Sequence, residues 1–166
     1  MSEPVIRSAD AGDVQRIQEL YTQLDRHHAE FLPAIFRPLK EKARPDDLIQ
    51  EWIDKDDADY LVATIDGQIV GFINLQSSAH PKYPMFRRHA FAAIENIVVD
   101  NAHRNKGFGT ALLAAAVTWA KVRGLNYMQT TAWYANEDAR KFYSSHGFLP
   151  LSQRLEIDLN PSEPSA

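Results

Sequence analysis

Two glycines and two basic side chains lie close together in the middle of the chain, within the stretch NAHRNKGFGTALL that starts at position 101. Gly107 and Gly109 stand where an apolar, helix-like pattern begins, and Arg104 and Lys106 precede them. The first turn of a helix exposes backbone N–H groups and a partial positive charge, and glycine allows close approach to the backbone. These residues are typical of a phosphate-binding site, although two glycines can also form only the turn before a core helix.

The distribution of charge favours an anion at this place. No Asp or Glu occurs from Asn101 to Asn136, a stretch that holds Arg104, Lys106, Lys121 and Arg123, whereas the whole chain has a net charge of −4. A locally basic segment in an acidic protein attracts anionic ligands. We therefore expect an anionic ligand beside the two glycines.

Two common nucleotide-binding loops do not match the stretch. A Walker loop ends in Gly-Lys-Ser/Thr, but Gly107 is followed by Phe108, Gly109 and Thr110. The dinucleotide fingerprint GxGxxG needs a small residue where Leu112 stands, and it follows its strand directly rather than after the seven residues 100–106. Both nucleoside triphosphatases and Rossmann-type dehydrogenases are therefore disfavoured.

The composition is that of an ordinary globular domain. The chain has 166 residues, 18 Lys and Arg against 22 Asp and Glu, 45% hydrophobic residues and no cysteine. These values argue against a disordered or nucleic-acid-binding protein, and the lack of cysteine excludes disulfides and a cysteine nucleophile. We expect one domain over residues 1–159 and a disordered tail over 160–166, which contains two prolines and two serines.

No segment of the sequence suggests export, a membrane span or a metal site. The N-terminus lacks the apolar stretch of a signal peptide, and the most apolar run, 110–120, is well short of the roughly 20 residues that cross a bilayer. The six histidines show no spacing typical of metal ligands. We expect a cytoplasmic protein without a metal and without a membrane or nucleic-acid partner.

Hydrophobic periodicity predicts an α/β fold, a mixed sheet with helices on its faces. Val5 and Ile6 begin it as a short strand, and a hairpin is expected around the turn Asp66-Gly67. The other expected strands are 91–99, 127–133, 148–151 and 154–159, and the expected helices follow Asp10, Pro45, Lys106 and Asn136.

Two motifs resemble the GNAT superfamily of N-acetyltransferases. The signature Arg/Gln-x-x-Gly-x-Gly/Ala matches Arg104, Gly107 and Gly109. A second family segment, Asn-x-x-Ala-x-x-Phe-Tyr-x-x-x-Gly-Phe, matches Asn136, Ala139, Phe142, Tyr143, Gly147 and Phe148. The resemblance covers residues 91–150, while the N-terminal half agrees only in the order of its elements.

The resemblance implies acetyl-CoA as cosubstrate, bound where the central, mostly antiparallel sheet splays apart. The family commonly has a bulge at this slot, between strands 91–99 and 126–133. The pantetheine arm would pair with the backbone of Ile97, Val98 and Val99, an arrangement that resembles strand addition. Asn136 would cap its helix and hydrogen-bond the cofactor. The diphosphate would lie on the backbone N–H groups of Arg104, Asn105, Lys106, Gly107, Phe108, Gly109 and Thr110.

Two side chains match the family's catalytic groups. An amine acceptor of pKa about 10.4 must lose a proton before it attacks, and Glu95 resembles the glutamate that accepts this proton in several relatives, usually through water. Glu95 could instead face solvent or anchor the substrate. Tyr143 resembles the tyrosine that protonates the leaving thiolate, although a helical tyrosine can also simply pack in the core. A backbone N–H of 97–99 would stabilise the oxyanion.

The resemblance implies transfer of an acetyl group to a primary amine of a small molecule by direct attack in a ternary complex. Alternatives are an N-terminal or lysine amine of a protein, and a non-catalytic acyl-CoA sensor. A homodimer is a further expectation, since dimers are common among relatives. The acidic stretch 46–59 could attract a cationic acceptor or form a solvated helix face. His27 and His28 could contact the acceptor, or could instead cap the first helix or lie at the surface. Four aromatic residues fall in the regions that line the acceptor site in this family, and could instead belong to the core: Phe31, Phe36, Tyr83 and Phe86.

Overall fold

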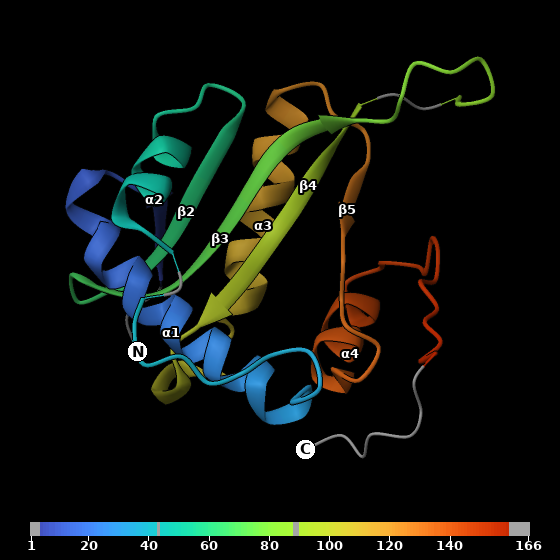
Figure 1. Cartoon of the computed structure of the whole chain (residues 1–166). Coiled ribbons are helices and arrows are strands. Elements are labelled where there is room, and N and C mark those ends of the chain that lie inside the picture. The colour runs from blue at the N-terminus through green and yellow to red at the C-terminus, as the bar shows by residue number, and fades with distance from the viewer. Residues whose placement is uncertain (1–3, 43, 88–89, 160–166) are drawn as a thin grey trace.

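The computed structural model describes residues 4–42, 44–87 and 90–159, so the expectation of a disordered tail over 160–166 lies outside the described residues. A five-stranded sheet forms its centre, with the strands side by side in chain order (Figure 1). The first four strands pair antiparallel and the fifth pairs with the fourth in parallel, which confirms the predicted mixed, mostly antiparallel sheet. The strands are β1 (Val5–Ser8), β2 (Ala58–Ile65), β3 (Gln68–Ala79), β4 (Ala90–Val99) and β5 (Met128–Thr130).

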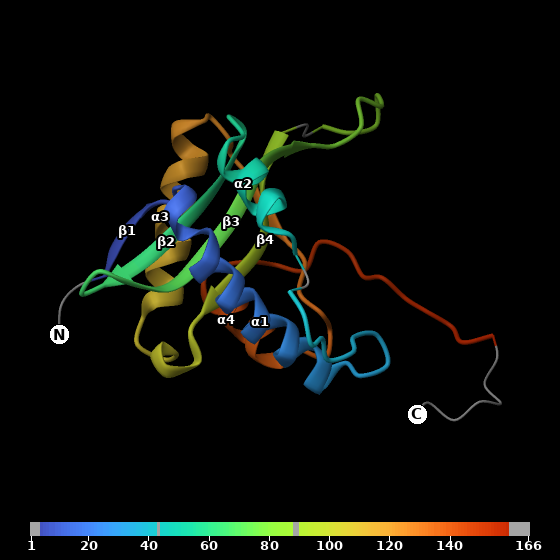
Figure 2. The same ribbon diagram turned by 60° about the vertical axis from the view of Figure 1, so that its left-hand side comes forward.

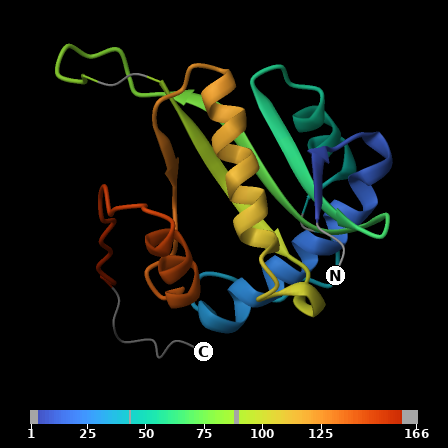
Figure 3. The same ribbon diagram turned by 180° about the vertical axis from the view of Figure 1, so that it is seen from behind.

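Helices cover both faces of the sheet, because alternate side chains of each strand point to opposite sides. Tyr60 and Val62 of β2 belong to the core under α1 (Val14–Phe31) and α2 (Asp46–Ile53). Leu61 and Ala63 belong to the core under α3 (Phe108–Val122), the helix in front in Figure 3. The sheet therefore carries one core on each face. The remaining helix, α4 (Glu137–Ser145), lies beyond β5.

Several turns and caps confirm predictions made from local sequence. Asp10 forms a capping box with Asp13 before α1, and the Asn136 side chain accepts a hydrogen bond from the Ala139 N–H at the start of α4. Asp66 and Gly67 both have positive φ, as a two-residue hairpin turn requires. These contacts depend on residues within three positions of each other, so the sequence contains enough to predict them.

The C-terminal strands were predicted wrongly. Neither 148–151 nor 154–159 belongs to the described five-stranded sheet, although both lie in described residues. β5 is also shorter than the predicted 127–133. A strand needs a hydrogen-bonded neighbour, and within the described chain 149–159 has none of the sheet's strands as a partner.

The connection from β4 through α3 to β5 positions the candidate site. β4 and β5 pair only over three positions, from Ala92 with Met128 to Ile94 with Thr130. Beyond Thr130 the chain leaves β4, so the two strands diverge toward the C-terminal end of β4 (Figure 1). In the part of the chain that the structure describes, no helix is long and apolar enough to cross a membrane.

Candidate active site

The loop between β4 and α3 has the backbone expected of a phosphate-binding loop. A short 3-10 helix (Asn101–His103) is followed by Asn105 and Gly107, both in the left-handed region with φ of 59° and 85°. Gly107 is the N-cap of α3, and the Ala111 N–H donates to its carbonyl at 3.0 Å. This is the first hydrogen bond within the helix. The backbone N–H groups before Ala111 therefore have no partner in the helix, and they are available to an anion.

Asp100 anchors the loop to α1. Its carboxylate accepts hydrogen bonds from Arg16 Nη2 at 2.6 Å, from the Ala102 N–H at 2.9 Å and from Gln23 Nε2 at 3.3 Å. Gln23 Oε1 also accepts from the Asn101 N–H at 3.0 Å. Burial opposes ionisation of Asp100, but these donors and the charge of Arg16 outweigh it and lower the pKa of Asp100 to about 2. The basic loop is therefore held in place by an acidic residue just outside it.

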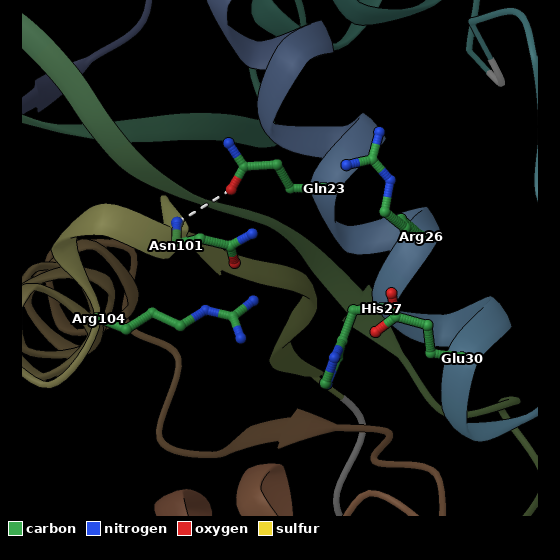
Figure 4. A pocket seen from close by; sticks show the side chains of 6 residues that line it. All are labelled: Gln23, Arg26, His27, Glu30, Asn101 and Arg104. Atoms are coloured by element: carbon green, nitrogen blue, oxygen red, sulfur yellow. Dashed lines mark hydrogen bonds between the residues drawn. The ribbon is translucent and has the colours of Figure 1, made fainter.

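A pocket of about 310 Å³ lies between this loop and α1, beside the contacts that join them. Figure 4 shows Arg104 reaching from the loop toward the C-terminal half of α1. Two guanidinium groups against one carboxylate make the pocket suitable for an anion. The α1 side of the pocket contributes three acidic or basic residues that the two sequence motifs do not include, Arg26, His27 and Glu30. The lining residues are Gln23, Arg26, His27, Glu30, Asn101 and Arg104.

Beyond the loop, the C-terminal end of β4 has one open edge. Ile97, Val98 and Val99 pair with β3 on one side, while their pairing with β5 on the other side has already ended at Ile94. Backbone N–H and C=O groups at an unpaired edge can bind an extended ligand as an added strand. An extended molecule on this edge would run from the loop at Asn101 to Glu95 over roughly 20 Å.

Glu95 lies at a bulge in β4. Asn74 of β3 pairs with Asn96 and its neighbour Leu75 pairs with Ile94, so Glu95 is the extra residue. In a regular strand Ile94 and Asn96 would point to the same face of the sheet, but the extra residue makes them point to opposite faces. Ile94 packs in the core under α3, whereas the Asn96 amide is 3.5 Å from the Tyr21 hydroxyl of α1. The exposed Glu95 carboxylate accepts a hydrogen bond from Gln76 Nε2 at 3.1 Å.

Tyr143 lies where β4 and β5 begin to diverge. Its side chain is 8% exposed and hydrogen-bonds Thr130, whose hydroxyl donates to the Ile94 carbonyl at 3.2 Å. Burial raises the pKa of Tyr143 above its ordinary value, and the hydrogen bond with Thr130 only partly opposes this. The phenol therefore stays protonated at neutral pH. Ile94 and Thr130 are the last residue pair that joins β4 and β5, and this pair positions the Tyr143 hydroxyl.

The other residues expected to bind the cofactor make contacts within the protein itself. The Phe108 side chain is buried in the core, which leaves only its backbone for a ligand, and the Thr110 hydroxyl is 3.1 Å from His146 Nε2. Lys106 Nζ donates to the Ala102 carbonyl at 2.9 Å. A Cβ on Gly109 would lie 3.3 Å from the Phe142 ring, so this glycine also permits close packing of α3 on α4. Packing is thus one reason for the second glycine.

The structure brings only some of the expected acceptor-side aromatics together. His28 stacks on Phe36 with ring centroids 5.0 Å apart, and Phe36 meets Trp133 edge-on at 5.3 Å. This cluster joins the segment after α1 to the segment after β5. Tyr83 and Phe86 instead belong to the loop after β3, which projects from the other end of the sheet. Trp133 was missed from sequence, where it had only the appearance of a strand residue.

A buried polar network was also missed. The hydroxyls of Tyr21 and Tyr60 are 2.9 Å apart, and Arg44 lies over the Tyr21 ring at 3.9 Å. Burial is the main reason that the pKa of each tyrosine is raised, so both remain neutral. In the acidic stretch 46–59, Asp46 bonds Lys42 and Asp59 bonds Ser8, so these two carboxylates are engaged in separate local contacts.

Replacing Asp100 with Asn should change the pH dependence of stability. The pKa of Asp100 is near 3.8 when unfolded and about 2 when folded, so its stabilisation is present above pH 4 and is lost as the pH falls toward 2. Urea unfolding between pH 6 and 2 should therefore show a less steep loss in Asp100→Asn, by about 2 kcal/mol over the range. The exposed Glu137→Gln should follow the wild type. Equal slopes in all three proteins would contradict the anchoring role.

Comparisons with known proteins agree with this geometry. A model of the acetyltransferase (GNAT) family matches residues 21–148. The L-amino acid N-acetyltransferase AaaT of Escherichia coli is 28% identical over 154 residues, which cover 89% of this chain and 84% of the relative. An uncharacterized N-acetyltransferase of Methanocaldococcus jannaschii is 31% identical over 86% of this chain and 59% of its own length.

Solved structures share the fold. A tetramutant of the BH1408 protein from Bacillus halodurans superposes with a TM-score of 0.88 at 23% identity, over 93% of this chain and 99% of the other. The aminoglycoside N-acetyltransferase AAC(6')-Iy, solved in complex with CoA, superposes with a TM-score of 0.71 at 19% identity, over 95% of each chain. The family model spans more than half of the chain, and so this protein belongs to the GNAT family of acetyltransferases.

Proposed function

We propose that this acyltransferase moves the acetyl group of acetyl-CoA to a primary amine of a small molecule, with both substrates bound at once. The observation that carries the proposal is the divergence of β4 and β5 beyond the pair Ile94–Thr130. This divergence leaves an edge of β4 open between the loop before α3 and the bulge at Glu95. A long molecule with an anionic end and a reactive end fits that arrangement.

Acetyl-CoA has the chemistry that this surface would bind. Its diphosphate would accept hydrogen bonds from the backbone N–H groups of 104–110, with Arg104 as a charged neighbour. Its pantetheine amides would pair with the open edge at 97–99. The thioester would then lie near Tyr143 and Glu95, because both lie at the bulge end of that edge.

The reaction needs two proton transfers and no covalent intermediate on the protein. The amine nitrogen attacks the thioester carbon, the C–N bond forms, and the C–S bond breaks. Glu95, through a water molecule, would accept the proton that the amine loses. Tyr143 would donate a proton to the departing thiolate, and a backbone N–H of 97–99 would stabilise the negative oxygen.

The proposed acceptor is a small amine. The relatives are described as acting on L-amino acids and on aminoglycosides, which are small amines. The cluster of His28, Phe36 and Trp133 joins α1 to the segment after β5, and its Trp133 side chain is 38% exposed. A partly exposed indole ring attracts cationic amines. Burial lowers the pKa of His28, so this imidazole is largely neutral near pH 7 and does not repel a cation.

Tyr143→Phe and Glu95→Gln should separate chemistry from binding. Each should lower kcat by about 10²-fold or more, because each removes a proton-transfer group, while the Kd for CoA changes little. Tyr134→Phe and Glu137→Gln are matched controls at exposed positions and should keep full activity. Steady-state kinetics with calorimetry of CoA binding would measure both quantities. Unchanged turnover in both variants would contradict the assignments.

The proposed reaction is tested with acetyl-CoA and a panel of amines, by following free thiol and product mass. The panel contains L-amino acids, polyamines, an aminoglycoside and short peptides with free N-termini or lysines. The proposal predicts thiol release that depends on one of the small amines and a product heavier by one acetyl group. Release with peptides alone would instead favour a protein acceptor. Tight CoA binding without amine-dependent release would favour a sensor.

A further inference from the structure

His146 lies where the end of α4 meets the start of α3, and neither sequence motif gives it a role. It is the C-cap of α4, at one of the three positions that the second motif leaves open between Tyr143 and Gly147. Figure 2 shows α4 beside the end of α3 that joins the loop after β4. The contact is close, since a Cβ on Gly109 would lie 3.3 Å from the Phe142 ring, whose centroid is 4.5 Å from that of His146. His146 is exposed at this junction, so a ligand on the first turn of α3 can contact it.

The hydrogen bonds of His146 show which ring nitrogen carries the hydrogen when the imidazole is neutral. Nδ1 lies 2.7 Å from the Phe142 carbonyl oxygen, which can only accept, so Nδ1 donates this bond. The Ser145 hydroxyl donates to the same carbonyl at 2.8 Å. Nε2 of the neutral ring is then an acceptor, and its partner at 3.1 Å is the Thr110 hydroxyl. The neutral imidazole therefore takes the one hydrogen that Thr110 Oγ1 can donate.

Thr110 belongs to the turn of α3 on which the proposed diphosphate would lie. It is the third residue of the helix, and its N–H comes before the first bond within the helix, from Ala111 to Gly107. A diphosphate oxygen in this turn would also accept from the Thr110 hydroxyl if the hydroxyl hydrogen were free. Neutral His146 occupies that hydrogen, whereas a protonated ring donates from Nε2 to Thr110 Oγ1 and leaves the hydrogen to the phosphate.

The charges around His146 make its protonation depend on an anion. The end of α4 favours a cation and the start of α3 opposes one, because the two ends of a helix carry partial charges of opposite sign. Charged groups on the elements that meet here are engaged with other partners: Lys106 with the Ala102 carbonyl, Arg140 with the Tyr134 ring and Lys141 with Glu137. A diphosphate beside the ring would neutralise the start of α3. An imidazole in such surroundings can gain a proton near neutral pH.

We infer that His146 is a further cofactor-binding residue, which takes up a proton from the solvent as the diphosphate of CoA binds beside Thr110. In the bound state Nδ1 donates to the Phe142 carbonyl, Nε2 donates to Thr110 Oγ1, and the Thr110 hydroxyl donates to the diphosphate. The inference rests on the proposed function for the identity of the ligand. Because the bound state holds the extra proton, the affinity is highest at low pH and falls as the pH rises.

Isothermal titration calorimetry measures the proton directly. The probe is dephospho-CoA, which keeps the diphosphate and lacks the 3′-phosphate, a monoester that itself titrates at roughly pH 6. Titrations at pH 7.5 in HEPES and in Tris, whose ionisation enthalpies differ, should show that the wild type takes up a large fraction of one proton and that His146→Gln takes up none. The matched control His80→Gln, at a histidine that stacks on Phe86 in the loop after β3, should take up as much as the wild type.

The outcomes separate this inference from the proposed function. Binding by the wild type without a linked proton, or equal uptake by His146→Gln, would overturn the role of His146 and leave cofactor binding intact. No binding of dephospho-CoA by the wild type would overturn the proposed function, and this inference with it.

A second test follows the affinity with pH. The Kd of the wild type for dephospho-CoA should rise roughly tenfold from pH 6 to 8.5, while that of His146→Gln stays nearly constant. Thr110→Val should lower the proton uptake, and Thr110→Ser, which keeps the hydroxyl, should retain it. Acetylpantetheine lacks the diphosphate, so wild type and His146→Gln should use it equally well. Equal pH profiles of Kd, unchanged uptake in Thr110→Val, or lost acetylpantetheine turnover in His146→Gln would overturn the inference.

Discussion

The divergence of β4 and β5 is the constraint on which the rest of the site depends. A sheet normally satisfies the backbone groups of an inner strand on both sides, and here the pairing stops at Ile94 and Thr130 while β4 continues to Val99. The bulge at Glu95 occurs at the same point and turns the Asn96 side chain toward α1. The end of the β4–β5 pairing and the bulge in the β3–β4 pairing thus coincide, and together they set the open edge, the position of Glu95 and the position of Tyr143.

The loop that follows β4 must be rigid to serve as an anion site, and its rigidity comes from outside its own basic residues. Asp100 and Gln23 bind the loop to α1, and Arg16 completes the contact. A loop that is already ordered loses little conformational entropy when a ligand binds. Asp100 next to the basic loop is therefore compatible with anion binding, because Arg16 neutralises its charge.

The parts of the fold that follow from neighbouring residues could be predicted, and those that need distant partners could not. The Asn136 cap and the Asp66-Gly67 turn are local and were predicted. The bulge at Glu95, the Tyr21–Tyr60 pair and the contact of Phe36 with Trp133 depend on strand register and on packing across the sheet. Residues 148–151 and 154–159 were predicted as strands, but in the described chain neither segment belongs to the five-stranded sheet.

The central claim is that the open edge of β4 and the loop before α3 together hold coenzyme A. Hydrogen–deuterium exchange with and without CoA measures this directly, because a bound ligand slows exchange of the amides it covers. The account predicts slower exchange in two segments, 97–99 and 104–110, with 58–65 of β2 unchanged. Equal exchange rates in 97–99 and 104–110 with and without saturating CoA would contradict it.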